Sequence, residues 1–332
     1  REKVGLMDLS TFSKFEVKGR DAYAFLERIC ANKIPTKDGG IVLGHLLNEN
    51  GFIESEITVT RLGLEHFYVL SAAVAQLHDK DQLEWRKLAT EKVTVTDVTD
   101  DFGVLVLAGP LAREVLSHCT ATDLSNASFR WLTGKEAEVA GVKKVRLLRV
   151  NYVGELGWEL HVPMADMPKV FDSLTKAGKP YGLKLFGTYA MNSLRMEKSY
   201  RGWGSELTTE IDMFEASMER FIQLDKPDFI GKAATLSKHQ RGARMKLVPL
   251  EVANTDSDCV GNEPVYSGEK IVGLTTSGGY GHAVKKSLAF AYVDPAMTAM
   301  GTGFDVLMFG EKRKASIVSE SLWDPTNARL KA

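Results

Sequence analysis

Hydrophobic residues in the first 240 positions recur at both strand and helix spacing, which predicts a mixed α+β structure. Residues 3–35 predict a strand followed by a helix, because residues 10–19 alternate between polar and apolar side chains. The helical spacing that follows is carried by four apolar residues, Ala22, Phe25, Leu26 and Ile29. Residues 43–60 and 66–71 predict two strands joined by a turn at Gly63.

Two further helices are predicted after these strands. The segment 66–89 changes from strand to helix, and the end of this helix places Trp85, Leu88 and Ala89 on one face. Residues 93–119 predict a strand, a Gly-Pro turn and a helix. Pro110 suits the first helical position, where its missing N–H has no partner to lose.

The next block repeats this layout. Residues 143–150 predict a strand, a glycine-rich loop and a second strand follow, and residues 165–178 predict a helix. Residues 188–200 predict the strongest later helix. The last ninety residues contain short alternating runs with frequent glycine, which is typical of a small all-β unit. We therefore expect two domains, residues 1–241 with two α+β units and residues 242–332 with the β unit.

The loop between the two strands of the second block, NYVGELGWEL at residues 151–160, carries the most chemical information. Gly154 and Gly157 allow a sharp turn and the close approach of a flat ligand. Glu159 falls among apolar residues, where an acid needs hydrogen-bond donors. A planar heterocycle with ring N–H and amino groups would supply them. The alternative is a hairpin turn with exposed acids.

Composition narrows the class of protein. The 332 residues are 44% hydrophobic and 26% charged, with a net charge of −1, which argues against an electrostatic nucleic-acid binder. No apolar run is long enough to span a membrane. Three isolated cysteines and seven scattered histidines lack metal-ligand spacing, so we expect reduced thiols and no metal site. The start at Arg1, without a signal peptide, leads us to expect a fragment or a processed subunit of a cytoplasmic or mitochondrial-matrix protein.

The decamer resembles the folate-contacting loop of the glycine-cleavage T-protein family, and in particular the tetrahydrofolate-binding C-terminal region of dimethylglycine and sarcosine dehydrogenases. Further segments resemble this family in the same order and cover nearly the whole chain: residues 4–35, 47–62, 193–208, 225–234, 276–293 and 322–330. The resemblance implies a cloverleaf of two α+β units and a C-terminal β-barrel around a central folate channel.

The resemblance also implies an activity. An iminium or formaldehyde, released by N-demethylation of a methylated amine, would be joined to tetrahydrofolate as 5,10-methylenetetrahydrofolate, in a pathway such as glycine betaine catabolism. The chain has neither GxGxxG after a strand nor a GxxxxGK[ST] loop. We therefore expect FAD only in a separate flavin-containing oxidoreductase domain or subunit.

The family's catalytic carboxylate corresponds to Glu56, where relatives usually carry Asp. Glu has the same chemistry with one more methylene, and such a misplacement of about 1 Å can slow a reaction by about 10²-fold. Glu54 is the neighbouring alternative. A strand would place Glu54, Glu56 and Thr58 on one face, so Thr58 is expected to line the pocket. The other reading of Glu56 is a solvent-facing strand residue.

The resemblance assigns cofactor contacts to three more residues. Glu159 corresponds to the acid that holds the pterin ring by paired hydrogen bonds, and Tyr152 and Tyr200 correspond to tyrosines that contact the cofactor. T-proteins carry an Arg at the position of Met191, and the dehydrogenases lack it. Arg195, beside Glu197 and Lys198, is expected in a structural ion pair.

Two other functions stay open. One is a stand-alone methyltransferase, either an aminomethyltransferase or a sulfonium demethylase. The other is a non-catalytic folate-binding or assembly protein, like the iron–sulfur biogenesis relatives of this fold. Those relatives carry KGCYxGQE, and the corresponding SYRGWGSELT here has no cysteine.

Overall fold

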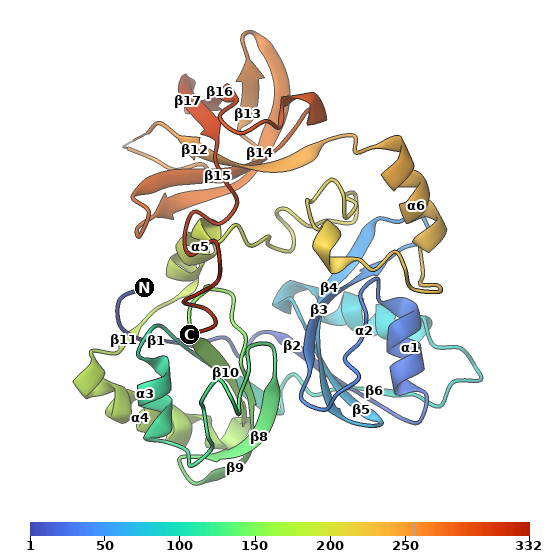
Figure 1. Cartoon of the computed structure of the whole chain (residues 1–332), viewed down its shortest axis with the longest axis vertical. Coiled ribbons are helices and arrows are strands. Elements are labelled where there is room, and N and C mark those ends of the chain that lie inside the picture. Colours follow the sequence, from blue (N-terminus) through green and yellow to red (C-terminus); the bar gives the residue numbers. More distant parts are fainter. Residues whose placement is uncertain (255) are drawn as a thin grey trace.

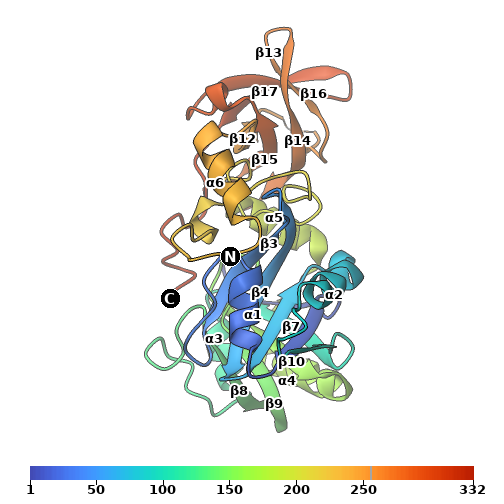
Figure 2. The same cartoon turned by 90° about the vertical axis from the view of Figure 1, so that its right-hand side faces the viewer.

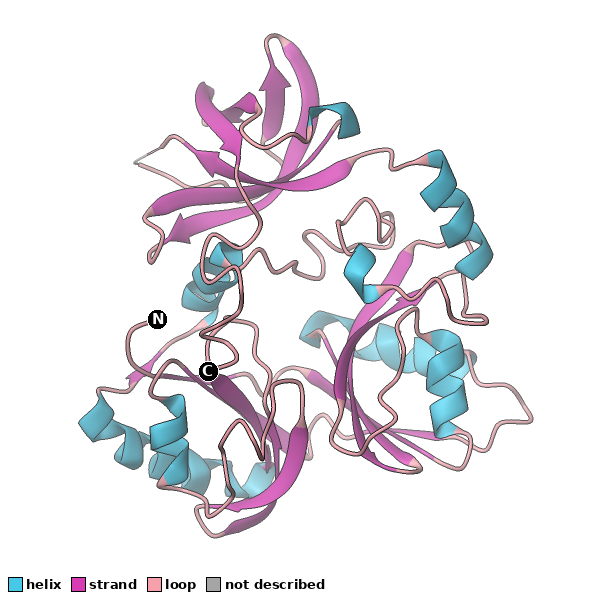
Figure 3. Ribbon diagram, in the orientation of Figure 1, coloured by secondary structure: helices cyan, strands magenta, loops and turns pink. Residues whose placement is uncertain are grey.

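The computed structural model describes residues 1–254 and 256–332, and it arranges them as three units at the corners of a triangle (Figure 1). Two units are sheets covered by helices, and the third is a closed barrel of six strands. Figure 3 shows the helices on the outside of the two sheets and very little helix in the barrel. The expected α+β architecture with a C-terminal β-barrel is confirmed.

The first sheet has the strand order β3-β4-β5-β2-β6. Its elements are β2 (Ser13–Lys18), α1 (Ala22–Ile29), β3 (Ile41–Leu47), β4 (Ile53–Gly63), β5 (His66–Ser71), α2 (Gln76–Trp85) and β6 (Thr94–Asp97). The four apolar residues predicted for the first helix are all buried in α1. They pack with Leu83 of α2 on one face of this sheet, together with Ile57 and Val59 of β4. This helix-covered face is the outer face of the first sheet.

The second sheet has the order β11-β1-β7-β10-β9-β8. Its elements are β1 (Gly5–Asp8), β7 (Phe102–Ala108), α3 (Ala112–Ser117), β8 (Gly134–Val139), β9 (Val142–Leu148), β10 (Gly157–Pro163), α4 (Met167–Gly178) and β11 (Lys184–Leu185). Trp158, Leu160 and Val162 of β10 are buried against residues of α3 and α4, which define the outer face of this sheet. Both sheets contain the predicted repeat, in which two strands lead through a short 3₁₀ turn into a helix.

The remaining elements connect the sheets to the barrel and build it. They are α5 (Thr188–Glu197), α6 (Lys232–Arg241), β12 (Lys246–Val252), β13 (Pro264–Ser267), β14 (Lys270–Gly281), β15 (Lys286–Val293), β16 (Gly303–Met308) and β17 (Glu311–Ile317). The barrel closes because β12 pairs with both β15 and β17. Figure 2 shows the barrel stacked above the two sheets, with α5 and α6 at the level between them.

Several predicted elements differ from the structure. The segment 3–35 contains two strands in different sheets, and the segment 43–60 is a hairpin of β3 and β4 rather than one strand. Helix α2 ends at Trp85, so Leu88 lies beyond it, and the side chains of both residues are exposed rather than on a buried face. Pro110 precedes α3, which begins at Ala112.

The inner faces of the two sheets, which carry no helices, pack against each other. Ile41, Tyr68 and Leu70 of the first sheet form a buried apolar cluster with Leu148 of the second. Strand alternation places Glu159 and His161 of β10 on this inner face, because Trp158, Leu160 and Val162 point outward. The polar residues of β10 therefore lie where the two sheets meet.

Glu206 forms a junction between the segment after α5 and the barrel. Its side chain is fully buried and accepts hydrogen bonds from Arg195 Nη1 at 2.8 Å and the Gly202 amide at 2.7 Å. On the barrel side, Thr276 Oγ1 donates at 2.7 Å and Ser277 Oγ also donates. This Glu206 junction joins β14 of the barrel to the helical segment through a satisfied buried carboxylate.

We expect Trp158→Ala to lower the free energy of unfolding by about 3–5 kcal/mol, the usual cost of truncating a fully buried aromatic residue. Trp158 has no exposed surface and packs edge-on against Phe129. Trp85→Ala is the matched control, because Trp85 is 77% exposed and its loss should change stability by about 0.5 kcal/mol or less. Urea denaturation of both variants measures the difference, and equal costs would contradict the assignment of outer and exposed faces.

Candidate folate site

The loop before β10 is held in place by Asn151. Its Oδ1 accepts from the backbone amides of Val153 and Gly154 at 3.1 and 3.0 Å, and its Nδ2 donates to the Glu155 carbonyl at 2.9 Å. Gly154 has a left-handed φ of 70°, which favours glycine. The loop that precedes the candidate binding acid is therefore fixed by its own hydrogen bonds.

The two glycines of this loop make room for the protein itself. A Cβ at Gly154 would overlap the side chain of Lys198, and a Cβ at Gly157 would overlap the Leu107 carbonyl of β7. The sequence predicts that these glycines admit a flat ligand. The structure corrects this interpretation, because the space beside them is filled by neighbouring chain.

The two acids of the loop have opposite surroundings. Glu155 is buried and satisfied: Trp323 Nε1 donates to it at 2.7 Å, and Arg1 and Arg329 form ion pairs with it at 3.2 Å. Within the described residues, no hydrogen bond reaches the carboxylate of Glu159, whose side chain is only 13% exposed. His161 Nε2 lies 3.6 Å from its Oε2.

Burial raises the pKa of Glu159 to about 8. The charged form is disfavoured because the side chain has lost most of its water and gained no donor. A ligand that brought two N–H donors would stabilise the carboxylate and lower this pKa. Glu159 therefore has the surroundings of a binding acid that is completed by a ligand.

Glu56 lies on the inner face of the first sheet, on β4. The alternating burial of this strand places Glu54, Glu56 and Thr58 on the same face, as the sequence predicted. Glu54 accepts a hydrogen bond from Asn48 Nδ2 at 2.8 Å. The side chain of Glu56 is 20% exposed and lies opposite His45 of β3, with 3.5 Å between its Oε1 and the Nε2 of this residue.

His45 was not identified from the sequence. It has no exposed surface, and neither ring nitrogen has a hydrogen-bond partner within the described residues. Phe221 packs beside the ring, with 6.1 Å between the ring centroids. His45 therefore gives Glu56 a buried neighbour that can accept or donate a proton.

Tyr152 and Tyr200 lie next to each other, with ring centroids 5.9 Å apart. The hydroxyl of Tyr152 donates to the Arg201 carbonyl. Burial raises the pKa of Tyr152, and the nearby charge of Glu56 adds to this rise; burial also raises the pKa of Tyr200 to about 12. Both hydroxyls therefore stay protonated at neutral pH.

Glu159 and Thr58 belong to facing surfaces. Leu148 is the β9 partner of Glu159, and Leu70 is the β5 partner of Thr58. Leu148 and Leu70 pack in the same buried cluster between the sheets. The structure thus places Glu56, Thr58 and Glu159 on the inner faces of the two sheets. Tyr152, in the loop before β10, lies beside Tyr200, in the segment after α5.

A buried polar network that the sequence does not predict lies next to Glu159. Tyr68 of β5 is hydrogen-bonded through its hydroxyl to His161 Nδ1 at 3.0 Å. The guanidinium of Arg146 lies 4.4 Å from the centroid of the Tyr68 ring and forms an ion pair with Glu16. These residues come from both sheets, so no local pattern in the sequence could relate them.

Two residues of α5, Met191 and Arg195, make packing and ion-pair contacts within the protein. Met191 packs in an apolar cluster with Val106 and Val153. Arg195 does form a buried ion pair, but its partner is Glu206 rather than its helical neighbour Glu197. Residues two apart on a helix do not face each other, which explains the more distant partner.

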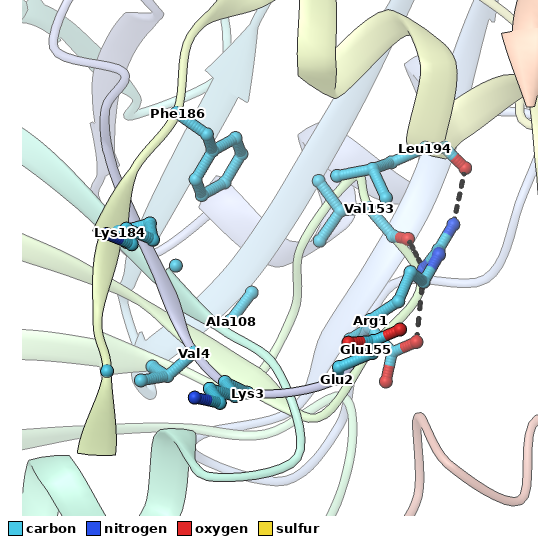
Figure 4. Close-up of a pocket in the computed structure, with 12 residues that line it drawn as sticks. Arg1, Glu2, Lys3, Val4, Ala108, Val153, Glu155, Lys184, Phe186 and Leu194 are labelled. Atoms are coloured by element: carbon cyan, nitrogen blue, oxygen red, sulfur yellow. Dashed lines mark hydrogen bonds and ion pairs between the residues drawn. The ribbon is translucent and has the colours of Figure 1, made fainter. Parts of the chain in front are cut away.

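A cavity of about 490 Å³ lies elsewhere in the second sheet unit (Figure 4). Its wall includes Arg1, whose guanidinium donates to the carbonyls of Val153 at 2.6 Å and Leu194 at 2.8 Å. None of the five predicted site residues lines this cavity. Its lining is Arg1, Glu2, Lys3, Val4, Gly5, Ala108, Val153, Glu155, Gly182, Lys184, Phe186 and Leu194.

Within residues 1–254 and 256–332, no helix is long and apolar enough to cross a membrane. In the same residues, no three His, Cys, Asp or Glu side chains are grouped as metal ligands, and Cys30, Cys119 and Cys259 are free thiols.

The fold and the paired inner faces define a class of protein. Residues 1–226 match the GCVT N-terminal domain, and residues 245–324 match the glycine cleavage T-protein C-terminal barrel domain. The chain belongs to the glycine-cleavage T-protein family, whose members are folate-dependent aminomethyltransferases that bind tetrahydrofolate. The structure agrees with this: the crystal structure of aminomethyltransferase T from Bartonella henselae superposes with a TM-score of 0.89 over 98% of this chain and 88% of that one, at 25% identity.

Relatives of two kinds are similar to the chain. It is 40% identical over 99% of its length to mitochondrial dimethylglycine dehydrogenase of Mus musculus, and it spans 38% of that protein. It is 31% identical to an aminomethyltransferase of a Thermoanaerobacter species, over 97% of this chain and 87% of that one. A third relative, at 35% identity, is 4-methylaminobutanoate oxidase (formaldehyde-forming) of Paenarthrobacter nicotinovorans, of which the chain spans 40%.

Tetrahydrofolate fits the residues that are present. Its pterin ring carries a ring N–H beside an amino group, and Glu159 is a nearly buried carboxyl group to which no described residue donates a hydrogen bond. Paired N–H donors are what a carboxylate binds best. The donor groups of the ligand and the acceptor of the site are thus complementary.

Proposed function

We propose that this chain captures the one-carbon unit released by N-demethylation of a methylated glycine, either an iminium or formaldehyde, and joins it to tetrahydrofolate as 5,10-methylenetetrahydrofolate. The observation that carries the proposal is the nearly buried Glu159, which has no donor within the described residues and lies on the inner face of one sheet, while Glu56 lies on the inner face of the other. The similarity to dimethylglycine dehydrogenase and to a formaldehyde-forming oxidase supports the nature of the one-carbon source.

In this proposal some side chains bind tetrahydrofolate and others transfer a proton. Tetrahydrofolate, when bound, supplies the nitrogen nucleophiles. Glu159 holds the edge of the pterin ring, and Tyr152 and Tyr200 contact the cofactor beside it. Glu56 accepts a proton as the new C–N bond forms, with His45 Nε2 3.5 Å from its Oε1 as the next proton carrier. Thr58, on the same face, lines the pocket.

The position of these groups between two packed sheets also limits water. Formaldehyde and iminium groups react with water, so a site that excludes it retains them for the folate nitrogen. A flavin-containing oxidoreductase domain or subunit is the proposed source of the one-carbon unit, in the cytoplasm or the mitochondrial matrix. We further propose that residues 1–241 form the folate-binding region and that residues 242–332 form the barrel domain.

A stand-alone aminomethyltransferase is the second candidate, because the chain spans 87% of one such relative. The two differ in the one-carbon donor. The first proposal requires free formaldehyde, or an iminium handed over by a flavoenzyme, to be consumed.

The test supplies formaldehyde and tetrahydrofolate to the chain and follows 5,10-methylenetetrahydrofolate with a coupled dehydrogenase. We expect formation at least tenfold above the uncatalysed condensation at equal reactant concentrations. Folate binding with no acceleration would favour the second candidate. Absence of folate binding by calorimetry would contradict both.

A further inference from the structure

Behind Glu159, the side chains of Tyr68 and His161 form a hydrogen-bonded chain that the one-carbon chemistry does not require. Both are buried and come from different sheets, with Tyr68 on β5 and His161 on β10. Tyr68 Oη lies 3.0 Å from His161 Nδ1, and His161 Nε2 lies 3.6 Å from Glu159 Oε2. The rings of Tyr68 and His161 pack edge to face, with centroids 5.3 Å apart.

The direction of the hydrogen bonds follows from the available partners. Burial, followed by the charges of Lys14 and Arg146, lowers the pKa of His161, so the imidazole is neutral and carries one N–H. Burial also raises the pKa of Tyr68, so its hydroxyl keeps its proton. Within the described residues, His161 Nδ1 is the only hydrogen-bond acceptor for the proton of this hydroxyl.

If Nδ1 carried the imidazole proton, the Tyr68 hydroxyl would accept it and its own proton would be buried without an acceptor, which is costly. If Tyr68 donates to Nδ1, the imidazole proton is on Nε2 and faces Glu159. Arg146, a donor only, lies over the Tyr68 ring and its charge favours this direction. The Nε2–H tautomer therefore gives the Tyr68 proton an acceptor and directs the imidazole proton toward Glu159 Oε2, which lies 3.6 Å away, just beyond hydrogen-bond distance.

We propose that Tyr68 and His161 are positioning residues, which fix the Nε2–H of His161 toward Glu159 and so stabilise its carboxylate form for binding the pterin. This inference rests on the proposed folate function of Glu159. The ionisable groups around the chain are Arg146 on β9, Lys14 and Glu16 on β2, and Tyr68 itself. The gap of 3.6 Å would close when Glu159 ionises and draws the N–H toward it.

The test measures the dissociation constant of 5-formyltetrahydrofolate, a stable folate, from pH 6 to pH 9.5. His161→Leu removes the N–H. We expect about tenfold weaker binding at pH 7, a midpoint of the pH dependence about one unit higher, and parental affinity at pH 9.5, where Glu159 is ionised in both proteins. A merely structural role would weaken binding at every pH, so that result would overturn the proposal.

Conservative variants distinguish the effect of the Nε2–H from the effect of the imidazole ring. In His161→Gln the amide nitrogen can replace Nε2–H, and we expect a near-parental midpoint. Tyr68→Phe should raise the midpoint by less than His161→Leu, because the tautomer is no longer fixed. Leu160→Ala is the matched packing control on the outer face of the same strand; it should lower the melting temperature and leave the midpoint unchanged. His161→Asn, whose shorter amide cannot reach Glu159, repeats the test if the leucine variant does not fold.

Glu159→Gln separates the two claims. If Glu159→Gln removes the pH dependence while His161→Leu and His161→Asn keep the parental midpoint, the positioning role is wrong and the folate role of Glu159 stands. If Glu159→Gln changes neither affinity nor pH dependence, the folate placement itself is wrong.

Discussion

Replacing Glu56 with glutamine should slow the formation of 5,10-methylenetetrahydrofolate by about 10²–10⁴-fold, the usual contribution of a general base. The amide cannot accept the proton released as the C–N bond forms, while its size and its place on β4 are preserved. Folate affinity should change by about threefold or less, because the pterin is bound by Glu159. Single-turnover rates with formaldehyde, together with calorimetric titration of folate, measure the two effects separately.

Two neighbouring changes make this test specific. Glu56→Asp restores the residue that relatives usually carry and should keep or raise the rate. Glu54→Gln is the matched control, since an amide oxygen can still accept from Asn48 Nδ2, and its rate should stay near the parental value. A parental rate in Glu56→Gln with a large loss in Glu54→Gln would assign the base to Glu54.

Glu159→Gln should weaken folate binding by about 10²-fold at pH 8.5 or above, which corresponds to a loss of roughly 2–3 kcal/mol. One oxygen of the parental carboxylate becomes an N–H, which repels a donor of the pterin. The parental pKa is about 8 because of burial, so the binding-competent carboxylate is depleted as the pH falls. Parental affinity should therefore rise from pH 6 to pH 8.5, and binding at pH 7 should release a proton.

The glutamine variant has no group to ionise at this position, so its affinity should be nearly flat over the same pH range. Calorimetry in buffers of different ionisation enthalpy measures the proton release directly. Glu136→Gln, at an exposed position of β8 in the same sheet, serves as the control and should match the parental protein. Proton uptake on binding, or an unchanged pH profile in Glu159→Gln, would contradict the assignment.

Local periodicity was sufficient to predict elements that bury one face along their length. The positions of Ala22, Phe25, Leu26 and Ile29 define the buried face of α1, and this face is confirmed. The alternating, glycine-rich C-terminal runs likewise predict strands, and they form the closed barrel. In both cases one face of each element is buried, so the apolar spacing in the sequence records the packing.

The wrong predictions arise where the end of a helix or a turn interrupts the hydrophobic spacing. Trp85 and Leu88 continue a helical spacing, but α2 stops at Trp85 and both side chains remain exposed. The strand predicted at residues 43–60 contains the Asn50-Gly51 turn, and Gly51 has a left-handed φ of 73°. An Asn-Gly pair between apolar runs is itself a strong hairpin signal.

Apart from Glu159, which its place among apolar residues singles out, the candidate site could be predicted only through resemblance. Glu56, Tyr152 and Glu159 are identifiable because they occupy positions in family motifs, whereas His45 and His161 have no such motif. Their roles depend on contacts across strands or sheets, such as the pairing of His161 with Tyr68, 93 positions away in the sequence. The properties of one residue alone cannot predict such a contact.

The Glu206 junction affects how the barrel could be exchanged between relatives. Although the chain enters the barrel at β12, the carboxylate of Glu206 is satisfied by Thr276 and Ser277 on β14 and by Arg195 on α5. A recombination point placed between α6 and β12 would separate this acid from half of its donors and leave a buried charge poorly compensated. An exchange between relatives should therefore move the barrel together with residues 195–206. Among sequences of this family, we expect four residues to change together or not at all: Arg195, Glu206, Thr276 and Ser277.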